Sequence, residues 1–289
     1  MRKALPALPL TIALLGGALP SSHPTPGTAY ATTPTVTSAD QAQPEVCEEV
    51  VDTDDCHSRY PAGCNANGKY DAALAFLKNR TDFPVVTSAP LLRQADYAKL
   101  ETRIPAGLGT NNHGAFLEEL KAVGEQQQYV VVGYLYPSKT EGAESSNCAL
   151  QAREDEVDFH IYVGFDPDIA KQLRDHKVFT GAAKSALNRE SVIVEMTPHF
   201  REHFEPDWTF DHVKALMGRQ VKIAGQLLID NEHNIPTQNC GLPDADQSKC
   251  WRASAWELHP VTQFWVCPTD SCDINGTAWV SVQQASAKQ

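Results

Sequence analysis

The alternation of apolar and polar residues in the second half of the chain constrains its fold more than any other feature. Five segments alternate with the period of two that strands with one buried face require. A segment with helical spacing separates the third from the fourth, beginning after Thr209, which can cap it, and stopping at Gly218. The expected strands cover 129–136, 155–164, 191–197, 220–229 and 252–266.

This order of three strands, a helix and two strands resembles the OB-fold, a small five-stranded Greek-key barrel. The resemblance extends from Gln128 to Cys267 and includes Gly133, which predicts a bulge or sharp bend inside the first strand. Pro260 should bend the last strand because proline cannot donate to a central ladder. We therefore expect an α+β protein built on a five-stranded OB-like β-barrel with an inserted helix. Three long segments are expected to be loops, at 137–154, 165–190 and 231–249, and two of these take the positions of loops that bind ligands in this fold.

A small Cys-containing helical region, residues 47–124, is expected to precede the barrel at 128–267. Apolar residues recur at helical spacing over 70–77 and 116–123, and Gly124 stands where a left-handed cap is needed. A weaker pattern predicts a third helix over 89–100.

Eight cysteines in a chain of 289 residues indicate disulfides if the chain is exported, because thiols oxidise outside the cytosol. No Cys-x-x-Cys pair occurs, so a zinc site is the weaker reading. Short-range closure favours Cys240 with Cys250, Cys267 with Cys272, and Cys56 with Cys64, which leaves Cys47 with Cys148, although many other pairings are open.

The amino terminus resembles an export signal, with Arg2 and Lys3 before an interrupted apolar run. We expect a signal peptide over 1–31, a flexible linker over 32–46 and a tail over 268–289. No stretch approaches the ~20 apolar residues of a transmembrane anchor. A secreted or periplasmic location is expected.

Four short phrases resemble those of secreted bacterial proteins that have no assigned activity, and that likeness implies no function. The phrases are Glu144-Ser-Ser-Asn-Cys148, Asp158-Phe-His-Ile161, Asp230-Asn-Glu-His233 and Trp256-Glu-Leu-His-Pro-Val261.

Two carboxylate–histidine pairs are the strongest candidates for chemistry. Asp158 and His160 lie two apart on one expected strand, and Glu257 and His259 repeat this spacing on the last strand, so each pair projects from one face. We expect both pairs to point away from the core towards solvent. If the strands approach, these four side chains form a ligand set for zinc or another divalent ion, whose bound water could attack an acyl or phosphoryl centre. The alternative is that each pair is a hydrogen-bonded brace on a surface strand.

The leading functional prediction is an exported, disulfide-stabilised binding module for a sugar, a small molecule or a protein. A metal-dependent hydrolase is the alternative, and no cofactor is predicted apart from its divalent metal. With 24 Lys and Arg against 36 Asp and Glu, the chain disfavours non-specific nucleic-acid binding. Aromatic stacking of ligands on Tyr134, Tyr136, Tyr162 and Trp265 is a weaker possibility. The candidate ligand-binding residues are Asp158, His160, Tyr162, Glu195, Asp230, Glu232 and His233.

Overall fold

The computed structural model of the chain describes residues 46–65, 70–84, 88–233, 238–242 and 245–286. The expected signal peptide and all but the last residue of the expected linker lie outside these residues. No helix in the described ranges is both long enough and apolar enough to cross a membrane.

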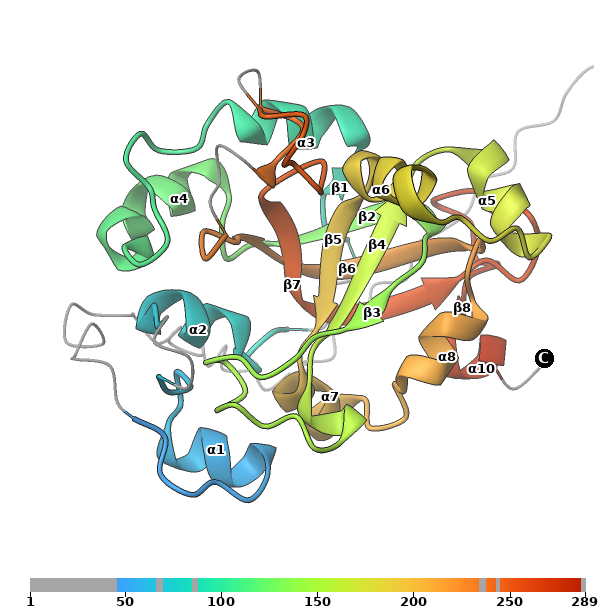
Figure 1. Ribbon diagram of the computed structural model, residues 1–289. Coiled ribbons are helices and arrows are strands. Elements are labelled where there is room, and N and C mark those ends of the chain that lie inside the picture. Colours follow the sequence, from blue (N-terminus) through green and yellow to red (C-terminus); the bar gives the residue numbers. More distant parts are fainter. Residues whose placement is uncertain (1–45, 66–69, 85–87, 234–237, 243–244, 287–289) are drawn as a thin grey trace, which may run out of the picture. The chain divides into compact units, whose positions relative to one another are not determined.

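Five strands form a closed barrel, which confirms the predicted fold (Figure 1). The first strand pairs antiparallel with the second and the fourth, the second with the third, and the fourth with the fifth, while the third and fifth run parallel. In chain order these strands are β2 (Gln128–Leu135), β4 (Phe159–Gly164), β5 (Val192–Met196), β6 (Gln220–Ile229) and β7 (Trp256–Val266).

Three two-residue strands extend the sheet beyond the barrel. β1 (Leu91–Leu92) runs parallel to β2, and β3 (Lys139–Thr140) pairs with β4. β8 (Val280–Ser281) pairs with β7 and leads into α10 (Val282–Ser286), so the segment expected to be a tail adds to the sheet.

The barrel interior holds the apolar half of each alternating strand. Phe159 and Ile161 of β4 are fully buried in the same cluster as Trp256 and Leu258 of β7. Because side chains alternate across a strand, the residues between them face outward from this core. The strand pattern therefore places Asp158, His160, Glu257 and His259 on the other face of the sheet.

Gly133 marks the place where β2 passes from one partner to another. β2 stays in continuous register with β6 as far as Tyr134, which also pairs with Gly164 of β4, so the expected bulge is absent from the β2–β6 pairing. The glycine is needed for close approach instead: a Cβ atom there would lie 2.6 Å from the Gly164 carbonyl oxygen and 2.6 Å from Val163 Cγ1.

We expect Gly133→Ala to lower the free energy of unfolding by about 1–3 kcal/mol, because the added methyl group overpacks against main chain that cannot move aside. The measurement is the urea midpoint under non-reducing conditions. Gly142→Ala is the matched control, since a Cβ there meets only Gln151 Oε1 at 3.8 Å. Equal midpoints for both variants would contradict the close-approach explanation.

The last strand is irregular at Pro260, as the sequence predicts. The His259–Pro260 peptide bond is cis. The register between β6 and β7 shifts on both sides of Gly225, and a Cβ at Gly225 would lie 2.8 Å from the Pro260 carbonyl oxygen.

Helices are the main regular structure in the described part of the region before the barrel, as predicted. Asp71 caps the second helix by accepting a hydrogen bond from the Leu74 amide, and Gly124 ends the fourth at φ 122°. The weakest expected helix is shorter than predicted, because residues 91–92 are in β1. The helices are α1 (Thr53–Arg59), α2 (Ala72–Lys78), α3 (Gln94–Glu101) and α4 (Leu117–Val123), with a 3-10 turn at His113–Phe116.

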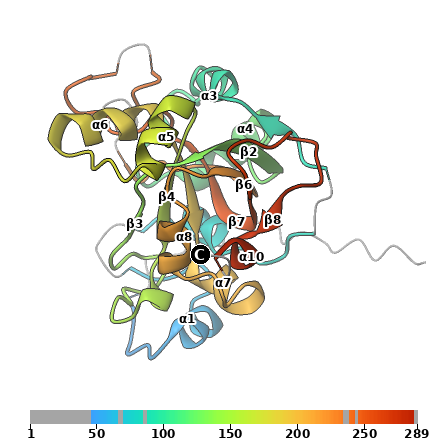
Figure 2. The same ribbon diagram turned by 90° about the vertical axis from the view of Figure 1, so that its right-hand side faces the viewer.

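The segment 165–190, expected to be a loop, contains two helices instead. α5 (Pro167–Arg174) has Asp166 as its cap and proline at its first position, a start signal that the loop prediction overlooked. α6 (Gly181–Glu190) follows, and Figure 2 shows both helices beside β4. The inserted helix is confirmed as α8 (Phe210–Ala215), capped by Thr209 and preceded by α7 (Pro198–Phe204).

Four disulfides join the eight cysteines, and two of the four expected pairings are correct. Cys240–Cys250 and Cys267–Cys272 close short loops as predicted. The other two were wrong: Cys47 pairs with Cys64, and Cys56 pairs with Cys148, 92 residues away. Short-range closure failed here because the helical region folds back onto the loop between β3 and β4.

Candidate functional site

The two carboxylate–histidine pairs converge through a residue of the strand between them. His160 of β4 lies directly opposite Glu195 of β5, and β5 runs parallel to β7, which holds Glu257 and His259. Asp158 immediately precedes β4. The expectation that these side chains face solvent is wrong, because none of the five residues is more than 6% exposed. A second layer of the protein covers this face of the barrel.

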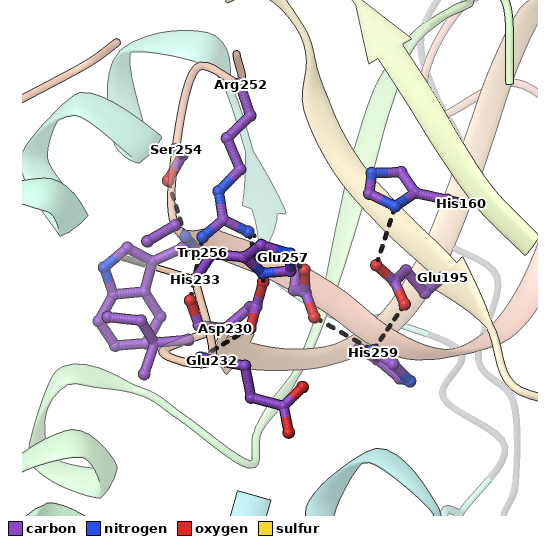
Figure 3. A network of polar contacts seen from close by, with 12 residues as sticks. His160, Glu195, Asp230, Glu232, His233, Arg252, Ser254, Trp256, Glu257 and His259 are labelled. Atoms are coloured by element: carbon purple, nitrogen blue, oxygen red, sulfur yellow. Dashed lines mark hydrogen bonds and ion pairs between the residues drawn. The ribbon is translucent and has the colours of Figure 1, made fainter. Parts of the chain in front are cut away.

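Close contacts link the five residues, and Figure 3 shows those among His160, Glu195, His259 and Glu257. His259 Nδ1 lies 3.1 Å from Glu257 Oε1 and 3.3 Å from Glu195 Oε2, and its Nε2 lies 3.8 Å from Asp158 Oδ2. His160 Nδ1 lies 3.5 Å from Glu195 Oε1 and 2.5 Å from Glu141 Oε1. Within this set, Asp158 and His259 are 1% and 0% exposed, whereas His160 and Glu195 are 3% and 6% exposed.

Four buried polar atoms of this group have no hydrogen-bond partner among the described residues. They are both carboxylate oxygens of Asp158, His259 Nε2 and His160 Nε2. One ligand atom each from Asp158, Glu195 and His259 also lie within 4.8 Å of one another. Unpaired buried polar atoms are costly in a folded protein, so their convergence makes this group the candidate place for a bound ligand.

Burial dominates the protonation behaviour of the site. It raises the pKa values of Asp158, Glu195 and Glu257 well above the ordinary carboxyl range, and neighbouring carboxylates raise them further. Burial also holds the pKa of His259 well below its usual value. A neutral imidazole is the form of histidine that binds metal ions.

The helices around the barrel contribute buried cations: Lys78 at the end of α2, whose Nζ lies 3.2 Å from Glu232 Oε2, and Arg201 of α7, whose charge acts on Asp158. The surrounding carboxylates, Glu232 foremost, outweigh burial and raise the pKa of Lys78 well above its usual value. Lys78 and Arg252 face a larger number of carboxylates, which are Glu141, Glu144, Asp158, Glu195, Asp230, Glu232 and Glu257. The inner group is thus rich in carboxyl groups relative to the buried cations around it.

The acidic segment after β6 lies beside this group but is already paired. Asp230 Oδ2 lies 2.7 Å from Arg252 NH1 and 2.6 Å from His233 Nδ1, and Glu232 contacts Lys78. His233 is half-exposed and packs edge-on against Trp251, whose ring also contacts His160. Asp230, Glu232 and His233, which the sequence predicted as ligand-binding residues, therefore lie beside the inner group and are paired with other side chains.

Tyr162 lies next to the site, with its ring centroid 4.9 Å from that of His160. It packs with Tyr136 in a second apolar cluster under α5 and α6, so these rings do not form an outer stacking surface. Trp265 lies apart from them, against Lys222.

Sequence reasoning missed Lys78, Glu141, Glu144 and Trp251, and treated Arg252 as one scattered base. Lys78 follows the apolar stripe of α2 and has no local signal for a role on the barrel. Glu144 was noted only within a short phrase before Cys148. If the pairing of Cys56 with Cys148 had been predictable from the sequence, it would have placed residues 144–148 over the barrel.

The chain matches no protein-family model, no curated protein and no solved structure. Its likeness to secreted bacterial proteins stays a prediction, and functional argument rests on the site itself.

Proposed function

We propose that this protein is an exported, disulfide-stabilised OB-like module whose ligand is a divalent cation. The supporting observation is the buried convergence of Asp158, Glu195 and His259 with unpaired ligand atoms. A mixed carboxylate and imidazole set suits Zn²⁺ or Mn²⁺. Four disulfides agree with an oxidising compartment.

Each residue of the proposed site has a distinct role. With its proton on Nδ1, His259 donates to Glu257 Oε1 and leaves the Nε2 lone pair facing Asp158, the arrangement in which a carboxylate orients a metal-binding histidine. Asp158 and Glu195 supply the charge that balances the cation. His160 is a positioning residue between Glu195 and Glu141 at the rim.

The burial of the site favours stable binding of an ion rather than catalysis on a substrate. A hydrolase needs a coordination position that substrate can reach. Asp158, Glu195 and His259 are at most 6% exposed, so hydrolysis would require the covering layer to move.

We expect the purified protein, after chelation and dialysis against Zn²⁺ or Mn²⁺, to retain about one ion per chain by elemental mass spectrometry. Glu195→Gln should weaken binding by at least about 100-fold in calorimetric titration, because a ligand oxygen and a charge are lost. Glu205→Gln is the control, since that carboxylate contacts Gln283 away from the site. A folded protein that takes up no ion, or equal affinity in the two variants, would overturn the proposal.

A further inference from the structure

Three histidine rings join the helix α1 to the helix α7. The rings of His57 and His199 are stacked with their centroids 4.0 Å apart, and His203 meets His199 edge-on at 4.7 Å. His57 is 7% exposed, and neither of its ring nitrogens has a side-chain or main-chain partner that meets hydrogen-bond geometry. His199 Nδ1 donates to the Asn79 carbonyl oxygen and His203 Nδ1 to that of His199. The contact between α1 and α7 is therefore built on imidazole rings, of which His57 is buried without a hydrogen-bond partner.

We infer that this histidine cluster is a pH-sensitive contact that holds the disulfide-tied α1 region on the barrel at neutral pH and releases it in acid. The second part of the inference rests on the proposed function: release of α1 loosens the cover of the cation site.

The charges around the cluster define the direction of the effect. Burial, and then the proximity of His199 and His203, lower the pKa of His57 to about 3. Burial also lowers the pKa of His199, against the opposing influence of Asp54 on α1. Glu202 on α7 has its own pKa raised by burial and by Asp54, Asp52 and Asp155, so these acids only partly offset the repulsion.

The direction of the pH effect follows from the difference in proton binding between docked and released α1. Released His57 titrates near the ordinary value of 6.5, so the docked form binds fewer protons than the released form between pH 6.5 and about 3. The ratio of docked to released α1 is highest above pH 6.5 and falls by about tenfold per pH unit below it. At pH 4.5 the ratio of docked to released α1 should be about 100-fold lower than at pH 7.5.

A continuous path connects α1 with the cover of the site. Cys56 of α1 is bonded to Cys148, and the Cys64 amide donates to the Ser145 carbonyl oxygen at 2.9 Å. Cys148 and Ala149 have φ of 52° and 62°, a conformation that L-residues rarely adopt and that their surroundings must hold. Glu144, in this same segment, is the carboxylate with the largest influence on buried Asp158. Movement of α1 therefore acts on the segment that covers the inner ligands.

Hydrogen exchange by mass spectrometry tests the first part of the inference without any ion. After correction for intrinsic exchange rates, we expect protection of peptides covering 53–59 to fall about 100-fold between pH 7.5 and 4.5, and protection of β7 not to fall. His57→Phe keeps a ring that can stack but cannot titrate, so its protection should fall less than tenfold. His199→Gln serves if His57→Phe does not fold, and His212→Phe is the control on a partly exposed histidine of α8. Constant protection of α1 in the unsubstituted protein, or an equal fall in His57→Phe, would overturn the inference.

Ion release tests the second part. At pH 5.5 a chromogenic chelator should remove Zn²⁺ up to about tenfold faster from the unsubstituted protein than from His57→Phe. Protonation of the ion's own ligands is common to both proteins and cancels in this ratio. Equal rates with pH-dependent exchange of α1 would refute the link to the site while leaving the contact established. Failure to bind Zn²⁺ at pH 7.5 would refute the proposed function and this link together, and leave the exchange result unaffected.

Discussion

Asp158→Asn is expected to stabilise the ion-free protein and to destabilise the ion-saturated protein, each relative to the unsubstituted chain. Without an ion, burial and the neighbouring carboxylates raise the pKa of Asp158 well above its usual range, and the substitution replaces this carboxyl group with an amide that is neutral at every pH and can donate to His259 Nε2. We expect a gain on the order of 1–3 kcal/mol, since a buried carboxyl group whose oxygens lack partners costs more than a hydrogen-bonded amide. With an ion at 1,000 times its dissociation constant, the unsubstituted protein gains about 4 kcal/mol that the variant lacks.

Urea midpoints at pH 7.5, measured with a chelator and with excess Zn²⁺, give both comparisons under non-reducing conditions. Asp175→Asn, at the exposed end of α5, is the control and should follow the unsubstituted protein in both. A lower midpoint for Asp158→Asn in chelator would show that the carboxylate stabilises the ion-free fold by itself. That result would remove the reason to place a cation there.

Arg252→Met is expected to cost about 3–5 kcal/mol of unfolding free energy, because it leaves a buried carboxylate without its strongest partner. Arg252 is 0% exposed. Its guanidinium donates to Asn239 Oδ1 at 2.7 Å, to Asp230 Oδ2 at 2.7 Å and to the Asp230 carbonyl oxygen at 3.0 Å. It therefore joins the loop after β6 to the start of β7.

The measurement is again the urea midpoint, with Lys171→Met as the control because Lys171 pairs with Asp175 in solvent. The double variant Arg252→Met/Asp230→Leu should recover part of the loss, since it removes the charge that the single variant strands. A midpoint shift for Arg252→Met no larger than that of the control would show that this ion pair contributes nothing to stability.

The barrel and the shared face of the site residues could be predicted from the sequence because both depend on local periodicity. Phe159 and Ile161 alternate with Asp158 and His160, and a period of two is enough to assign them to opposite faces. The helix between the third and fourth strands was readable from Thr209 and Gly218, which are local signals as well.

The burial of that polar face could not be predicted, because it depends on contacts between residues far apart in the chain. Lys78 reaches Glu232 across 154 positions, and Cys56 reaches Cys148 across 92. Strand pattern alone assigns polar residues to solvent, and only the folded helical region shows that a second layer lies over them. The same limitation hid the role of Glu195, which joins the two pairs only because β5 lies between β4 and β7.

The Cys56–Cys148 bond closes a covalent ring that contains α2, α3, α4 and the first barrel strand, while the other four barrel strands lie outside it. A protease that cut one peptide bond within the ring would therefore generate two polypeptides that still travel as one molecule. Under denaturing conditions, only a reductant would separate them.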